Sequence, residues 1–93
     1  MSTEKHKEAV RMIVRHLIDR RHAMKLSQVA LAGKVGINKS TLERIEMGKF
    51  SPNLETLLKL CEGLDLYFFV SPKEANNNFT EIMKARWGAH NPN

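Results

Sequence analysis

The chain has 93 residues, the length of one domain, which argues against a two-domain enzyme. Its composition, 42% apolar and 27% charged, is near the globular average and favours a packed core over disorder of the whole chain. Aromatic residues make up only 6%, with 5 Gly and 3 Pro, which argues against a turn-rich sandwich or barrel and predicts an all-α fold.

The net charge of +5 is distributed unevenly along the chain. Residues 1–49 hold 11 basic and 5 acidic residues, whereas residues 50–93 hold 4 basic and 5 acidic residues. A concentrated cationic surface suits a polyanion, because each neutralised phosphate releases counterions. A solvated helix face explains the same charge, so charge alone leaves both interpretations open.

The single cysteine, Cys61, cannot form an intramolecular disulfide, and no apolar run is long enough to cross a bilayer. The N-terminal residues lack the apolar segment of a secretion signal. We therefore expect a soluble protein of a reducing cytoplasm. The four histidines are not spaced to place two metal ligands on one helix face, and no phosphate loop or catalytic set is recognisable. The sequence thus predicts no metal, no cofactor and no enzymatic activity.

A first helix is predicted over residues 4–22, capped by Ser2 or Thr3. Its apolar stripe recurs with the period of a helix and comprises Val10, Ile13, Val14, Leu17 and Ile18. A basic row of Lys7, Arg11 and Arg15, each four residues apart, lies on a different face, where its default role is solubility.

Three shorter helices follow, each with its own polar cap. Ser27 is expected to cap a helix of about eight residues that ends at Gly36, and Asn38 to cap another that ends at Gly48. After the loop around Pro52, Asn53 caps a fourth helix. Their inward residues are predicted to be Leu31, Val35, Leu42, Ile45, Leu54, Leu57, Leu58 and Cys61.

The apolar run from residue 66 to residue 70 predicts a short strand. The chain contains no second convincing strand, so the expected partner is the same strand of another copy, which implies a homodimer. A last helical turn that fills the core is the alternative. The predicted dimerisation residues are Leu66, Tyr67, Phe68, Phe69 and Val70.

We place a domain boundary after residue 72. Residues 73–93 begin with a polar, Asn-rich linker and continue into a short amphipathic helix. A helix of this length is not stable alone in water, so the segment is expected to dock on its own chain, on the dimer mate or on a foreign partner, or else to remain disordered. Its apolar residues are Phe79, Ile82, Met83 and Trp87.

Two short capped helices joined by a tight turn form a helix-turn-helix, with small Ala32 where they approach and Gly36 in the turn. Residues 26–66, LSQVALAGKVGINKSTLERIEMGKFSPNLETLLKLCEGLDL, resemble the Xre/Cro-type helix-turn-helix of bacterial and phage repressors. The resemblance implies a bundle of four to five helices that binds double-stranded DNA, with the third helix in the major groove.

The resemblance also assigns roles to single residues. The positions that read base edges are Lys39, Ser40, Glu43 and Arg44. Arg and Lys donate to guanine, Ser donates or accepts, and Glu either accepts from cytosine or faces solvent. Phosphate-contacting positions are Gln28, Asn38 and Lys49.

A structural ion pair between Arg21 and Glu46 is implied in the same way. The sequence departs from the family at two positions: Gly33 lies inside the second helix, which softens it, and Met47 replaces a frequent Asn near the end of the third. The second departure removes one side chain that could donate a hydrogen bond to a DNA phosphate.

Residues 64–73 resemble the corresponding stretch of HipB-like antitoxins, which exchange a strand between dimer mates and bind a toxin. This resemblance makes the C-terminal apolar segment a candidate toxin contact. Two functional hypotheses follow. One is a dimeric, sequence-specific repressor that binds a palindromic operator. The other is an antitoxin or adaptor whose main role is to neutralise a partner protein, with DNA binding secondary.

Overall fold

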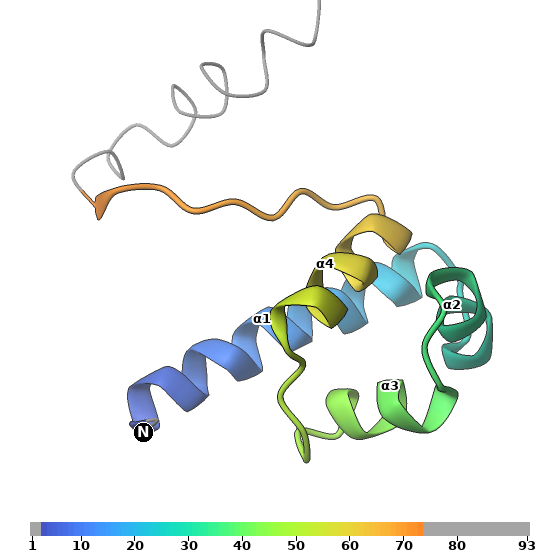
Figure 1. Ribbon diagram of the computed structural model, residues 1–93, viewed down its shortest axis with the longest axis horizontal. Helices are drawn as coiled ribbons and strands as arrows, with labels where there is room; N and C mark the ends of the chain where they lie inside the picture. The colour runs from blue at the N-terminus through green and yellow to red at the C-terminus, as the bar shows by residue number, and fades with distance from the viewer. Residues whose placement is uncertain (1–2, 74–93) are drawn as a thin grey trace, which may run out of the picture.

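The computed structural model describes residues 3–73, which form four α-helices and no strand. The helices are α1 (Glu4–Ala23), α2 (Gln28–Val35), α3 (Lys39–Glu46) and α4 (Leu54–Gly63). Figure 1 shows α2, α3 and α4 gathered around the C-terminal half of α1, while the N-terminal half of α1 extends away from them. The predicted all-helical fold is confirmed for the described residues. No helix among them is long and apolar enough to span a bilayer.

The helices begin at the polar residues that the sequence indicates. The side chains of Thr3, Ser27 and Asn53 each accept a hydrogen bond from a backbone N–H of the following helix, Ser27 at 3.0 Å and Asn53 at 2.8 Å. Asn38 occupies the N-cap of α3 without a side-chain cap bond. The three side-chain cap bonds satisfy backbone groups that a helix end leaves free, which explains why α1, α2 and α4 begin where the sequence predicts.

The core lies where the four helices meet. Leu31 of α2, Ile45 of α3 and Leu60 of α4 are each 1% exposed, and Leu64 after α4 is fully buried. The Arg20 Nε donates to the Leu64 carbonyl at 2.8 Å, which fixes the end of α4 against α1. The remaining buried apolar residues are Val14, Leu17, Ala32, Leu42 and Cys61.

Not all of the predicted apolar stripe is buried. Val10 and Ile13 of α1 are 36% and 38% exposed, because the other helices pack only on the second half of α1. Leu54 and Leu58 of α4 are also exposed. The periodicity therefore identified the core face of α1, α2 and α3 but not how far along α1 the core extends. On α4 the prediction was wrong in part, because Leu60 and Cys61 are buried there rather than Leu54 and Leu58.

The predicted strand over residues 66–70 is not formed within the described residues. A strand needs a neighbouring strand to complete its hydrogen-bond ladder, and residues 3–73 supply none. The segment instead leaves α4 as an extended chain (Figure 1). The predicted C-terminal helix, with Phe79, Ile82, Met83 and Trp87, lies outside the described residues, as does the linker before it.

Substitution by alanine is expected to change the free energy of unfolding in opposite directions at two glycines of the helices. A Cβ at buried Gly63 would collide with Cγ1 of Val35 and lie 3.3 Å from Cδ1 of Leu31, whereas a Cβ at Gly33 meets nothing within 4 Å. Gly63→Ala should therefore lower the free energy of unfolding, because overpacking costs about 1 to 3 kcal/mol and helix propensity returns only about 1 kcal/mol.

Gly33→Ala serves as the matched control and should raise the free energy of unfolding by about 1 kcal/mol, since it adds only helix propensity. Urea unfolding of both variants measures the difference. Equal stabilisation by the two substitutions would contradict the close packing of α4 on α2.

Candidate nucleic-acid interface

The turn between α2 and α3 sets the angle at which α3 leaves the body. Gly36 has a φ of 78°, in the left-handed region, and its N–H donates to the Ala32 carbonyl at 2.9 Å. The Ile37 N–H donates to the same carbonyl at 3.0 Å. Ala32 is 2% exposed, so the two helices approach at a residue with almost no side chain. Glycine suits the turn because it adopts positive φ without strain.

One side of α3 is held in the core and the opposite side is free. Leu42 and Ile45 are 2% and 1% exposed, whereas Lys39, Ser40 and Arg44 are exposed. The fold therefore fixes α3 through its apolar face and presents three side chains rich in hydrogen-bond donors to the outside.

Two of the predicted base-reading residues form a pair. Lys39 Nζ lies 3.0 Å from Glu43 Oε2, one helical turn away, and both side chains are nearly half exposed. A surface pair of this kind is weak. Breaking this ion pair therefore costs little free energy, so Lys39 and Glu43 can each bind a base edge instead of each other.

Arg44 has an aromatic neighbour that the sequence did not indicate. Its guanidinium carbon lies 5.7 Å from the centre of the Phe50 ring, in the loop between α3 and α4. Phe50 is 43% exposed. A cation above an aromatic face is attracted to it while its N–H groups remain available at the edge.

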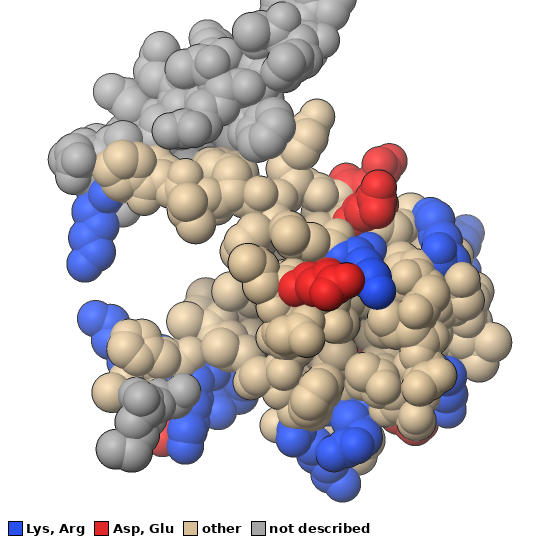
Figure 2. Space-filling model, viewed as in Figure 1, with Lys and Arg blue, Asp and Glu red and all other residues tan. Residues whose placement is uncertain are grey.

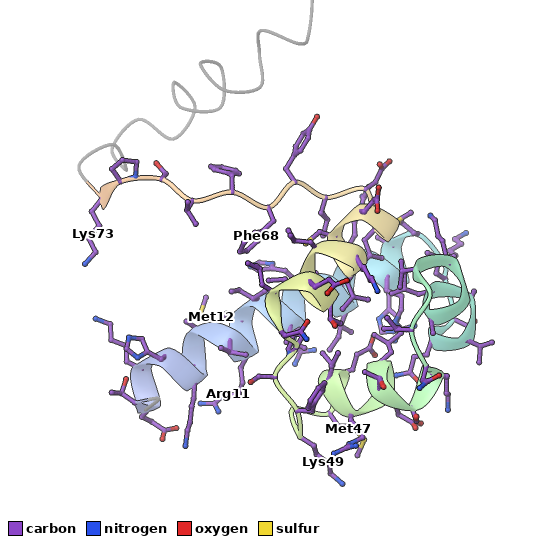
Figure 3. The ribbon with its side chains drawn as sticks, in the orientation of Figure 1. Arg11, Met12, Met47, Lys49, Phe68 and Lys73 are labelled. Carbon is purple, nitrogen blue, oxygen red and sulfur yellow. The ribbon has the colours of Figure 1, made fainter. Side chains whose placement is uncertain are left out.

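The three predicted phosphate-contacting residues differ in whether their side chains already make hydrogen bonds within the protein. Lys49 follows Gly48, whose φ is 79°, and Figure 3 shows its side chain extending from the lower edge of the molecule. The Asn38 side chain makes no cap bond. The Gln28 Nε2, in contrast, donates to Glu46 Oε1 at 2.9 Å, which occupies one of its two N–H groups.

Arg21 and Glu46 form the ion pair that the family resemblance implies. The Nε and Nη2 atoms of Arg21 donate to the two carboxylate oxygens of Glu46, both at 2.8 Å. The side chains are 9% and 10% exposed. Arg21 also donates from Nη1 to the Leu26 carbonyl at 2.9 Å. The pair joins α1 to α3 and, through Gln28, to the start of α2.

The surface charge is concentrated near α3. In Figure 2, Lys and Arg side chains predominate along the lower side of the molecule, around α3 and the N-terminal half of α1. The most visible acidic side chains lie on the upper side, over α4 and the turn after it. The face that carries α3 is therefore the one suited to a polyanion.

A match to known proteins decides the family. The helix-turn-helix family matches residues 17–69, more than half of the chain. The chain belongs to the helix-turn-helix family. Its α2 and α3 are thus the helix-turn-helix itself, and α1 and α4 complete the bundle around it.

One curated relative is an uncharacterised helix-turn-helix transcriptional regulator of Haemophilus influenzae, 34% identical over 65 residues. The match covers 70% of this chain and 66% of the regulator, just under two thirds of its length. No solved structure matches the chain significantly.

The described residues also bear on metal binding and on Cys61. Within residues 3–73, no group of three or more His, Cys, Asp or Glu residues is placed to hold a metal ion. Cys61 is 5% exposed, and this burial raises the pKa of its thiol, which therefore stays protonated at neutral pH. Its role in the structure is to pack in the core.

Proposed function

We propose that this protein is a DNA-binding transcription regulator in which α3 enters the major groove and reads base edges. The observation that carries the proposal is the fixed α3, with its apolar face in the core and Lys39, Ser40 and Arg44 exposed. The family and the regulator relative support the same function.

Each residue of the interface has a chemical role in the proposal. Arg44, held over Phe50, donates to O6 and N7 of guanine, and Lys39 donates to a neighbouring acceptor. Ser40 donates or accepts, and Glu43 accepts from a cytosine amine once Lys39 has moved to DNA.

Phosphate contacts flank these base contacts. Gln28 at the start of α2 and Asn38 at the start of α3 lie where backbone N–H groups and the helix dipole attract an anion. Lys49 adds a cation after α3. These contacts fix the register of the protein on DNA without carrying sequence information.

The two kinds of contact predict different mutant behaviour. Arg44→Ala should reduce the preference for the operator over random duplex by about 1 to 3 kcal/mol, whereas Lys49→Ala should weaken binding to all sequences alike and lower the salt dependence. Titration of both duplexes at two salt concentrations measures this. Lys59→Ala on α4 is the control. Equal losses on operator and random duplex for Arg44→Ala would exclude it as a base reader.

We further propose that the protein acts as a homodimeric repressor of a palindromic operator. Exposed apolar residues of α1 and of the extended segment support the dimer, among them Met12 at 56%, Tyr67 at 68% and Val70 at 80%. Large exposed apolar side chains that gather on one surface are typical of a protein interface.

A second proposed role is that of an antitoxin that neutralises a partner protein. The exposed apolar side chains of the extended segment and the resemblance of residues 64–73 to HipB-like antitoxins support it. A toxin gene beside the gene of this protein would supply the partner. Removal of residues 74–93 should then abolish toxin binding and spare DNA affinity, and a loss of both would argue against separate surfaces.

A further inference from the structure

The N-terminal half of α1 is not part of the core. The buried residues of α1 are Val14, Leu17 and Arg21, and every residue from 4 to 13 is exposed. Helices in proteins derive most of their stability from a packed apolar face rather than from intrinsic propensity. The core of the described residues therefore does not explain why residues 4–13 form a helix or why they carry these charges.

The basic row of α1 faces a groove shared with the loop after α3. The groove has a volume of about 830 Å³, and its lining includes Lys7, Arg11 and Arg15 from α1 and Lys49 from the loop. Figure 3 shows Arg11 extending from α1 toward the side of the molecule on which Lys49 lies. The row thus lies on the same side as α3.

The groove carries positive charge that acidic residues do not offset. Its two acids, Glu8 and Glu46, are engaged at 2.8 Å, the first with Arg11 and the second with Arg21. Hydrogen bonds from Glu8 and then Glu4 raise the pKa of Arg11, so this residue is charged but already compensated.

The other three groove cations remain available. No ion pair within residues 3–73 engages Lys7, Arg15 or Lys49. Three uncompensated cations around one groove, one of them directly after α3, are complementary to a chain of phosphates.

We propose that this groove is a second contact with the DNA backbone, in which Lys7 and Arg15 bind phosphates next to those that Lys49 contacts. The inference rests on the proposed DNA binding of α3. Lys7 and Arg15 are two helical turns apart, about 12 Å at a rise of 1.5 Å per residue, which spans several phosphates of one strand. The contact adds affinity and register but no base preference.

The groove is also lined by apolar residues, which are Val10, Met12, Val14, Ile18, Met47 and Phe50. An acidic protein segment would therefore fit the groove chemically. Continuity with Lys49, immediately beside the base-reading helix, favours DNA. The experiment below distinguishes DNA from an acidic protein as the partner that binds the groove.

The test compares the full chain with a Lys7→Gln/Arg15→Gln variant and a charge-matched Lys34→Gln/Lys59→Gln control, whose positions do not line the groove. Gln preserves helix propensity, and circular dichroism verifies the fold. Each protein is titrated against the selected operator and scrambled duplex over a range of salt concentrations. Ethylation interference then maps the phosphates that each protein contacts.

We expect the groove variant to lose about 0.9 from the salt exponent for each phosphate contact, about 1.8 in all, with equal fold losses on both duplexes. Its interference pattern should lose phosphates adjacent to those of Lys49. Behaviour identical to the control would overturn the inference alone and point to an acidic protein partner. Failure of the wild-type chain to prefer any duplex would overturn both this inference and the proposed function.

Discussion

Replacement of Arg21 by alanine is expected to lower the free energy of unfolding by about 3 to 5 kcal/mol, because it leaves the carboxylate of Glu46 buried without its cation. Both side chains are about nine-tenths buried, and the pair is joined by two hydrogen bonds of 2.8 Å. Gln28 would remain as a single neutral donor to the carboxylate. The loss is comparable with the whole stability of a small domain, about 5 to 15 kcal/mol.

Urea unfolding followed by circular dichroism measures this loss. Lys59→Ala is the matched control, because its pair with Glu55 is at the surface, with an N–O distance of 3.8 Å, and a surface pair contributes about 0 to 1 kcal/mol. An Arg21→Ala protein as stable as the Lys59→Ala protein would show that the pair does not hold α1 to α3. Glu46→Gln should also lower the free energy of unfolding, because it leaves the buried guanidinium of Arg21 without its anion, although the amide oxygen can still accept one hydrogen bond from it.

The second large effect is expected at the extended segment. Val70→Asp should weaken dimerisation by at least about a hundredfold, because the two-fold symmetry of the dimer would bury an unpaired carboxylate twice. Val70 is 80% exposed in the single chain, so the substitution should leave the fold of the monomer intact. Sedimentation equilibrium over a range of concentrations measures the association.

Val29→Asp provides the control for this prediction. Val29 lies on α2, outside the extended segment, and is 64% exposed. Its substitution should leave the association unchanged. A Val70→Asp protein that sediments like the wild-type protein, or a wild-type protein that is monomeric at all concentrations, would contradict a dimer joined through this segment.

Local chemistry made the helix boundaries predictable. Ser27 and Asn53 are polar residues directly before apolar periodic runs, and Gly36 is the residue that tolerates the left-handed conformation at the end of α2. These signals act within a few residues, so one sequence is enough to recognise them. The predicted strand over residues 66–70 is a different case, because a strand depends on pairing with a segment distant in sequence or in another copy, and local signals do not specify that pairing.

Side-chain contacts between residues far apart in the sequence were harder to predict. The place of Arg21 opposite Glu46 was inferred only from the family resemblance, and nothing in the sequence indicated that Gln28 would share the same carboxylate. The Phe50 ring lies near Arg44 because the loop after Gly48 turns back toward α3. Such contacts depend on tertiary geometry, which residue spacing does not specify.

How far the core extends along α1 could not be predicted from the sequence either. Val10 and Ile13 have the correct helical phase, yet they are exposed because the other three helices do not extend that far along α1. Apolar periodicity reports which face of a helix is apolar and not what covers it. This leaves exposed apolar side chains on the N-terminal half of α1 beside the basic row for which we propose a contact with DNA.

Selection of bound duplexes from a random pool, followed by titration of the selected sequence against scrambled DNA at two salt concentrations, tests the central claim most directly. The account predicts a palindrome with half-sites about one helical turn apart, bound at least about a thousandfold more tightly than scrambled DNA. Weak, salt-sensitive binding with no consensus sequence would contradict the proposal that α3 reads DNA bases.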